Sequence, residues 1–207
     1  MSKKGVFAII SIIIFVDQFS KIYIKTHYEL GEQLIIFDWF RILFVENDGM
    51  AWGAKLSDFS QKISDKSAKL FLTIFRILFL TGIGYWIVGL VKKKSSTLLI
   101  LSVSFIFSGA LGNIIDSVLY GVIFDNSHGQ IATLFPDRGY EDFFYGKVVD
   151  MLYFPLFSGY FPEWFPFLGN KYFTFFNPVF NIADMAICTG VGLLLLCNNS
   201  KLKKIRD

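Results

Sequence analysis

The feature that most constrains this chain is its division into long, nearly uncharged apolar blocks. Four blocks have about the 20-residue length that crosses a bilayer as a helix, and they cover residues 6–24, 70–91, 97–124 and 176–197. Hydrophobic residues make up 54% of the chain, and the mean hydropathy is +0.52. In a soluble domain, apolar residues would alternate with polar ones at the period of a helix or strand. We therefore predict one integral membrane domain over residues 1–207, all-α in class, with four transmembrane helices.

Clusters of basic residues predict the orientation of these spans. They precede the first span, separate the second from the third, and follow the fourth: Lys3 and Lys4; Lys92, Lys93 and Lys94; Lys201, Lys203, Lys204 and Arg206. With four spans, all three clusters lie on one side of the membrane, which the positive-inside rule assigns to the cytoplasm. We therefore expect both termini to be cytoplasmic and the two long connections, 25–69 and 125–175, to face outward.

The outward connections carry their own structural signals. Residues 33–45 contain alternating apolar and polar positions, which predict a short sheet at the membrane surface. Residues 153–167 are dense in Phe, Tyr and Trp, as in the aromatic belt at a membrane interface. We therefore expect a small extracytoplasmic subdomain of strands and loops. A net charge of +3 is too small to suggest binding to nucleic acid, and Cys188 and Cys197 lack the spacing of metal ligands.

Two carboxylates lie near the fourth apolar block. Asp150 ends Gly146-Lys-Val-Val-Asp150, and Asp184 ends Phe180-Asn-Ile-Ala-Asp184. An isolated charge is unfavourable in such surroundings. Two carboxylates held together can instead share one proton, which is how aspartic proteases activate water. The pair is therefore a candidate for acid–base chemistry.

Further polar residues interrupt the apolar blocks in pairs at helical spacing. The pairs are Asp17 with Lys21, Asn113 with Asp116, and Asn181 with Asp184. Charged residues within spans usually face the interior of the helix bundle and mark function. The alternative is that they only join helices through hydrogen bonds. Both interpretations place these side chains between helices rather than against lipid.

Five sequence blocks carry a resemblance to a known family. They are Asp17-Gln-Phe-Ser-Lys21, Asn47-Asp-Gly-Met-Ala-Trp-Gly53, Ser108-Gly-Ala-Leu-Gly-Asn-Ile-Ile-Asp116, Gly146-Lys-Val-Val-Asp150 and Phe180-Asn-Ile-Ala-Asp184. In order and topology they resemble lipoprotein signal peptidase (signal peptidase II), a family of bacterial intramembrane aspartic peptidases. Each block is a weak signal, but five in register cover most of the chain.

The resemblance implies that Asp150 and Asp184 form the catalytic dyad. It implies that seven further residues support the site or position substrate: Asp17, Lys21, Asn47, Gly49, Asn113, Asp116 and Asn181. The implied reaction removes the signal peptide of diacylglyceryl-modified prolipoproteins just before the lipid-bearing cysteine of the substrate. The implied location is the bacterial cytoplasmic (inner) membrane, with the active site near its outer face. The family needs no metal or organic cofactor and is inhibited by globomycin.

Two departures from the family pattern stand out. The family's third block normally ends in Asp-Arg, whereas here Asp116 is followed by Ser117. An insertion, residues 122–145, also separates this block from the one that ends at Asp150. Arg138 or Lys147 is a candidate to restore the missing positive charge, and the alternative is that the insertion is a solvated surface loop.

Two other classes of protein are compatible with intramembrane carboxylates. A small proton-coupled transporter would use them to relay protons, and a structural subunit would use them only to join helices. The acids cluster toward one face of the membrane, and no pair of broken, repeat-related helices is visible. The pattern therefore favours the peptidase.

Overall fold

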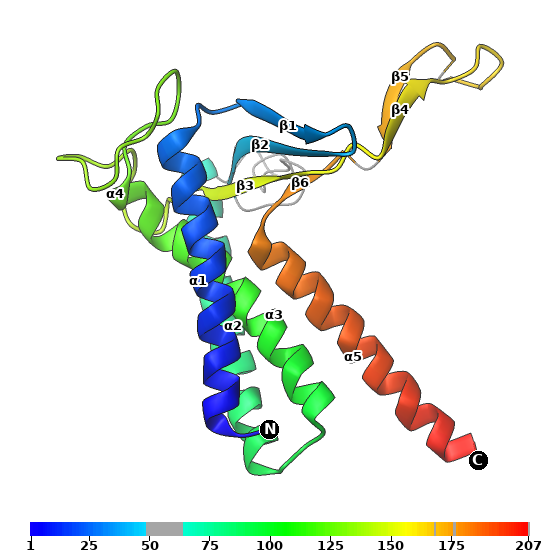
Figure 1. Cartoon of the computed structure of the whole chain (residues 1–207). Helices are drawn as coiled ribbons and strands as arrows, with labels where there is room; N and C mark the ends of the chain where they lie inside the picture. Colours follow the sequence, from blue (N-terminus) through cyan, green and yellow to red (C-terminus); the bar gives the residue numbers. More distant parts are fainter. Residues whose placement is uncertain (49–63, 168, 176, 207) are drawn as a thin grey trace.

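The computed structural model describes residues 1–48, 64–167, 169–175 and 177–206. Within these ranges, a group of long helices lies below a small sheet (Figure 1). The helices are α1 (Lys3–His27), α2 (Asp65–Lys92), α3 (Thr97–Ile115) and α5 (Ile182–Arg206). A π-helical turn, η3 (Asp116–Tyr120), and a short helix, α4 (Gly121–Ile123), continue α3. Helix α5 diverges from the others toward the C-terminus (Figure 1).

Most of the predicted spans are present as helices. Among the described residues, three segments have the length and composition to cross a membrane, Lys3–His27, Asp65–Lys92 and Thr97–Ile123, and Ile182–Cys197 is a shorter apolar helix. The predicted fourth span, 176–197, therefore began too early, because Val179–Phe180 pairs as a strand before the helix begins. Large apolar side chains point outward along the helices, including Phe7, which is 71% exposed, as expected for contact with lipid. The chain is a multi-pass membrane protein.

An antiparallel sheet covers one end of the helices, with strand order β1-β2-β3-β6. Its strands are β1 (Gln33–Phe37), β2 (Phe40–Asn47), β3 (Val148–Tyr153) and β6 (Val179–Phe180). The alternating stretch at 33–45 thus forms strands as predicted, and β3 was not predicted. A second sheet, β4 (Phe157–Tyr160) with β5 (Tyr172–Phe175), projects outward as a hairpin (Figure 1).

Glycines allow helices α3 and α5 to pack closely. A Cβ atom on Gly109 would lie 2.1 Å from the carbonyl oxygen of Ala183, and one on Gly112 would lie 2.6 Å from Oδ2 of Asp17. A larger residue at Gly109 would meet the backbone of α5, and one at Gly112 would displace the Asp17 carboxylate. Small residues commonly permit such close approach in membranes. The first turn of α5 is therefore held directly against α3 and α1.

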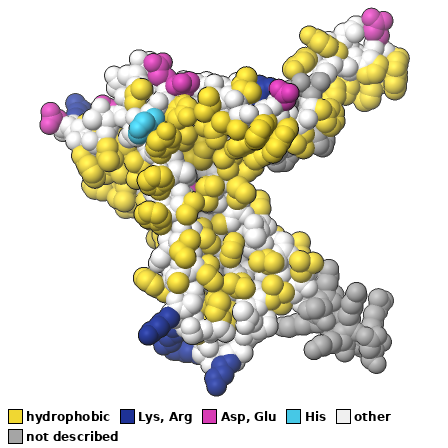
Figure 2. All heavy atoms as spheres, in the orientation of Figure 1, with side chains coloured by type: hydrophobic (Ala, Val, Ile, Leu, Met, Phe, Trp, Pro, Cys, Tyr) yellow, Lys and Arg dark blue, Asp and Glu magenta, His cyan; other side chains and the backbone are white. Residues whose placement is uncertain are grey.

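The two ends of the helix bundle differ in chemistry. Both chain termini and the α2–α3 connection lie at the end opposite the sheet (Figure 1). Lysine and arginine side chains gather there, whereas the sheet end carries a projecting hydrophobic hairpin and most of the visible acidic groups (Figure 2). The exposed Lys3, Lys4 and Lys92–Lys94 belong to the basic end. The fold therefore separates a basic end from an end that carries the candidate site.

Candidate active site

Helix α5 begins in a reciprocal hydrogen-bonded turn built from Asn181 and Asp184. The backbone N–H of Asp184 donates to Oδ1 of Asn181 at 2.9 Å, and the backbone N–H of Asn181 donates to Oδ2 of Asp184 at 3.3 Å. This is the geometry of a capping box, with Asp in place of the usual Glu. The spacing of three residues thus has a local cause, since it starts the helix and places the Asp184 carboxylate at its first turn.

Asp150 approaches the same point from strand β3. Its side chain is buried, with 4% exposure, and two amides contact its carboxylate. Nδ2 of Asn181 donates to Oδ1 at 2.7 Å, and Nδ2 of Asn47, at the end of β2, donates to Oδ2 at 3.3 Å. The side chain of Asn181 therefore bridges the two predicted dyad residues, accepting from the backbone of Asp184 and donating to the carboxylate of Asp150.

The surroundings of Asp150 favour its protonated form. Burial, and then the charge of Asp184, raise the pKa of Asp150 to about 7. Amide donors from Asn47 and Asn181 and the charge of Lys21 partly oppose this shift. A carboxylic acid with a pKa near neutrality can donate a proton at physiological pH, as acid–base catalysis requires.

A buried lysine organises the supporting residues. Nζ of Lys21 lies 2.9 Å from Asp17, 2.8 Å from Asp116 and 2.8 Å from Oδ1 of Asn113. Nδ2 of Asn113 in turn donates to Oδ1 of Asp184 at 2.8 Å. The polar residues of α1 and α3 thus form one network that reaches the candidate dyad.

Asp17 and Asp116 also accept hydrogen bonds from the backbone of the two elements that carry the dyad, α5 and β3. Oδ1 of Asp17 accepts from the backbone N–H of Ala183 at 2.8 Å, in the first turn of α5. Oδ2 of Asp116 accepts from the backbone N–H of Val149 at 3.3 Å, next to Asp150 in β3. Because Lys21 joins the two acids, the network holds α5 and β3 in a defined relation. These polar residues can therefore both join the helices and support a functional site.

The structure brings together all the predicted site residues that it describes. Asp17, Lys21, Asn47, Asn113, Asp116, Asp150, Asn181 and Asp184 are joined through the contacts above. The predicted site residue Gly49 lies outside the described residues.

Two residues at the site were not predicted. Nε2 of Gln18 donates to Asp116 at 2.8 Å and to the carbonyl of Gly112 at 3.2 Å. The guanidinium of Arg76, half-buried in α2, interacts electrostatically with Asp184. The signal for Arg76 was present in the sequence, because a single arginine within an apolar span usually faces a buried partner.

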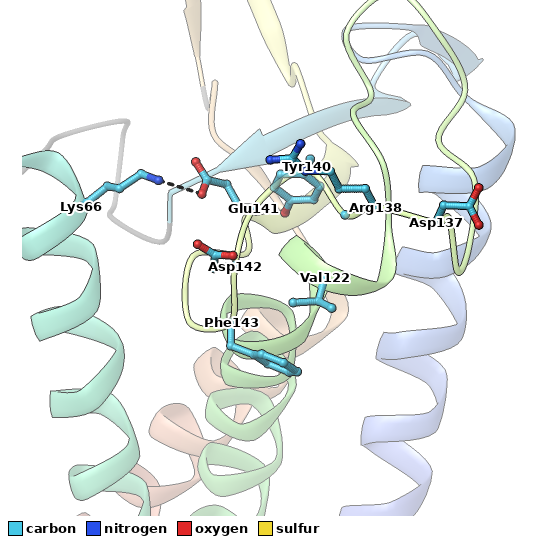
Figure 3. Close-up of a pocket in the computed structure, with 9 residues that line it drawn as sticks. Lys66, Val122, Asp137, Arg138, Tyr140, Glu141, Asp142 and Phe143 are labelled. Carbon is cyan, nitrogen blue, oxygen red and sulfur yellow. Dashed lines mark hydrogen bonds and ion pairs between the residues drawn. The ribbon is translucent and has the colours of Figure 1, made fainter.

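Neither predicted substitute for the missing arginine contacts the dyad carboxylates. Ser117 donates from Oγ to the carbonyl of Asn113 at 2.9 Å, and Lys147 lies 3.4 Å from Oε2 of Glu46. Arg138 is exposed and lines a pocket (Figure 3). The same pocket is lined by Glu141, also in the insertion, and by Lys66 of α2. Among the described residues, the Arg76 guanidinium, from a different helix, interacts electrostatically with Asp184.

Comparisons with solved structures identify the class of the fold. The chain is similar to a bacterial membrane enzyme solved by the in meso method at 2.3 Å, with a TM-score of 0.65 and 22% identity over 98% of this chain and 92% of that one. A second bacterial membrane enzyme, solved at 1.9 Å, gives a TM-score of 0.61 with 24% identity, covering 94% of this chain and 92% of that one. The fold is that of a multi-pass bacterial membrane enzyme.

Sequence comparisons identify the family. The family model described as Signal peptidase (SPase) II matches residues 9–199. The chain is 50% identical over 196 residues to the lipoprotein signal peptidase of Porphyromonas gingivalis, covering 94% of this chain and 82% of the relative. It is 34% identical over 210 residues to that of Amoebophilus asiaticus, covering 99% of this chain and 82% of the relative. This chain belongs to the signal peptidase II family of aspartic peptidases, which confirms the resemblance.

Proposed function

We propose that this protein is an aspartic endopeptidase that removes the signal peptide of diacylglyceryl-modified prolipoproteins, cutting immediately before the lipidated cysteine. Asp150 and Asp184 act as the dyad that activates a water molecule. Membership of the signal peptidase II family and the printed name of its relatives, lipoprotein signal peptidase, support the substrate class. The observation that carries the catalytic assignment is the Asn181 bridge between Asp150 and the first turn of α5, where Asp184 lies.

Asp150 is the general acid in this proposal. Its pKa, raised to about 7 by burial and by the charge of Asp184, keeps a proton available near neutral pH. This proton is donated to the scissile carbonyl oxygen, which stabilises the charge that develops in the tetrahedral intermediate. Two carboxylates in a low-dielectric site do not both ionise, so the pair shares one proton through the cycle.

Asp184 is the general base. It accepts hydrogen bonds from Nδ2 of Asn113 at 2.8 Å and from the backbone of Asn181 at 3.3 Å. It also lies in the first turn of α5, where the helix dipole favours negative charge, and it interacts with the Arg76 guanidinium. These groups support a carboxylate that takes a proton from water while Asp150 supplies one to the substrate. The roles reverse when the intermediate collapses.

The site lies where a lipid-anchored peptide can reach it. Asp150 belongs to the sheet at the end of the bundle opposite the basic termini and the α2–α3 connection (Figure 1). The positive-inside rule then orients both termini toward the cytoplasm and the site toward the outer face of the bacterial cytoplasmic membrane. In this orientation the substrate's acyl chains remain in the bilayer while its peptide enters the polar site.

The decisive experiment is cleavage of a purified, diacylglyceryl-modified prolipoprotein by the protein reconstituted in lipid. The wild-type protein is expected to release the signal peptide, and globomycin is expected to block release. Asp150→Asn and Asp184→Asn are each expected to abolish cleavage while eluting as folded protein in size-exclusion chromatography. Cleavage by either variant at a rate near that of the wild type would disprove the dyad.

A further inference from the structure

A second buried ion pair lies outside the candidate dyad, at the sheet end of α1. Lys25 has 0% exposure, and its Nζ forms an ion pair with Oε1 of Glu46, in β2. Oγ of Ser127 joins both partners, accepting from Nζ of Lys25 at 2.6 Å and donating to Oε1 of Glu46 at 3.0 Å. The network around Lys21 contains none of these three residues, so the dyad-supporting groups do not explain this pair.

The insertion, residues 122–145, closes over this pair. Nζ of Lys25 lies 5.3 Å from the ring centroid of Phe124 and 5.0 Å from that of Tyr140, both in the insertion. It lies 5.8 Å from the ring of Phe44 in β2. Aromatic faces at these distances attract a cation and exclude water from it. The insertion is therefore packed against α1 and β2 over this pair, and the prediction of a solvated surface loop is wrong for this part of it.

Glu46 remains ionised in this setting. Burial alone would raise its pKa, but the ammonium groups of Lys25 and Lys147 and the hydroxyl of Ser127 hold the pKa of Glu46 below its usual value. The charge of Asp125, also in the insertion, interacts favourably with that of Lys25. These charges therefore favour the carboxylate form of Glu46 in this contact.

Strand β2 connects this pair to the dyad. Glu46 and Asn47 are consecutive in β2, and successive side chains of a strand point to opposite faces. Glu46 binds Lys25 and the insertion on one face, whereas Asn47 donates to Asp150 on the other at 3.3 Å. In the β2–β3 register Asn47 lies opposite Val148, so a shift of β2 moves Asn47 relative to Asp150.

We propose that the insertion and the Lys25–Glu46 pair form a clamp that positions Asn47 against the carboxylate of Asp150. Lys25, Glu46 and Ser127 are positioning residues in this proposal, and none of them contacts the dyad carboxylates. The proposal rests on the proposed peptidase function and assigns the insertion a role in that reaction.

Breaking the pair is expected to release β2. Removing one member of a buried pair leaves the other as an uncompensated buried charge, which the structure relieves by moving. Because a misplacement of about 1 Å can lower a rate by ~10²-fold, Glu46→Gln is expected to lower kcat by about that factor. The value of KM is expected to change less, because Glu46 does not line the dyad.

A double-mutant cycle tests whether Glu46 acts through Asn47. Glu46→Gln and Asn47→Ala are each expected to lower kcat, and the double variant is expected to be no slower than Asn47→Ala alone. Multiplied losses in the double variant, or wild-type kcat in Glu46→Gln, overturn the clamp. Ser127→Ala is the milder variant if Glu46→Gln does not fold, and it is expected to lower kcat several-fold in the same non-additive way.

The pH profile gives a readout that general destabilisation does not move. Besides Asn47, the groups that face Asp150 are Asp184 and Asn181 of the α5 end and Lys21 of α1. The Asn47 amide favours the ionised form of Asp150, so losing it is expected to move the basic limb of the kcat profile to higher pH. Glu46→Gln and Asn47→Ala are expected to share this shift, and an unshifted limb in Glu46→Gln overturns the proposal.

A matched control comes from the opposite side of the insertion. Lys66 and Glu141 form an ion pair at 3.0 Å, but their side chains are 64% and 34% exposed (Figure 3). Lys66→Met/Glu141→Gln is expected to keep kcat within about twofold of wild type, because exposed pairs contribute little. A loss as large as that of Glu46→Gln would assign the effect to the insertion's general stability and overturn the clamp.

Hydrogen–deuterium exchange separates this proposal from the peptidase assignment. Glu46→Gln is expected to speed amide exchange in 40–47 and 148–153 while leaving α2 and α3 at wild-type rates. Faster exchange in all helices and strands, or an exchange rate unchanged in 40–47 and 148–153, overturns the clamp without any measurement of activity. Failure of the wild-type protein to cut a lipidated prolipoprotein would instead overturn the proposed function.

Discussion

Asn181 combines a structural and a chemical contact in one side chain. Its Oδ1 caps the first turn of α5 through the N–H of Asp184 at 2.9 Å, and its Nδ2 donates to Asp150 at 2.7 Å. The same Nδ2 lies 3.3 Å from the carbonyl oxygen of Val149. At the residue scale, the candidate site thus depends on an amide that offers a donor and an acceptor in fixed geometry.

The helix cap formed by Asn181 and its contact with Asp150 can be separated by substitution. Asn181→Ser keeps a good N-cap residue but loses the amide donor to Asp150, so it is expected to unfold near the wild-type temperature with kcat lowered by ~10²-fold. Asn181→Ala is expected to lose both, with an added stability cost of about 1 kcal/mol. Thermal unfolding in detergent and prolipoprotein cleavage check this. Wild-type kcat in Asn181→Ser would contradict the bridging role.

The pH dependence of cleavage follows from Asp150. Its folded pKa is raised to about 7, so the acid is available below that pH and is lost as pH rises through it. We expect kcat to fall on the basic side of a profile measured between about pH 5 and 9. The free energy of unfolding changes in the same direction. Asp150 stabilises the folded protein fully below its unfolded pKa, and this stabilisation is lost as pH rises through about 7. A kcat independent of pH across this range argues against Asp150 as the acid.

Arg76 offers a further test at the residue scale. Arg76→Gln removes the cation that interacts with Asp184, and we expect kcat to fall by about tenfold, equivalent to the loss of about 1.4 kcal/mol of interaction. Arg76→Lys retains the charge without the planar guanidinium, so its kcat is expected to lie between those of the wild type and Arg76→Gln. Single-turnover cleavage rates measure the effect. Equal rates in all three proteins would exclude a role for this charge.

At the scale of elements, three of the helices begin at a local serine cap. Ser2, Ser64 and Ser96 cap α1, α2 and α3, each accepting from the backbone N–H three residues on at 3.1–3.3 Å. Such caps act locally and can be read from sequence. Strand β3, in contrast, pairs with β2, in which Val45 lies opposite Asp150, and local sequence does not report pairing between such distant segments.

The contact between α3 and α5 depends on glycine. Gly109→Ala would place a Cβ 2.1 Å from the Ala183 carbonyl, so we expect destabilisation of about 1–3 kcal/mol and reduced cleavage as α5 moves. Gly192→Ala, in α5 with no heavy atom within 4 Å of the added Cβ, is the matched control. It is expected to be neutral or stabilising by up to about 1 kcal/mol. Equal unfolding temperatures for the two variants would refute the close-packing argument.

At the scale of the whole molecule, the separation of basic and catalytic ends predicts topology. In a background without Cys188 and Cys197, we expect Glu163→Cys, between β4 and β5, to react with a membrane-impermeant maleimide added to spheroplasts. Lys93→Cys, in the α2–α3 connection, is expected to react only after permeabilisation. Reversed labelling would place the candidate site on the cytoplasmic face.

By itself the sequence determined that long apolar helices cross a membrane and which polar residues are buried between them, because hydropathy acts over a few residues. Only the tertiary structure decided that Asp150 lies in a strand, that Arg76 interacts electrostatically with Asp184, and that the insertion packs over Lys25 and Glu46. These features depend on contacts between distant parts of the chain. Periodicity and charge patterns in the sequence do not specify which distant segments meet. Close packing and the pairing of buried charges in the folded protein decide this.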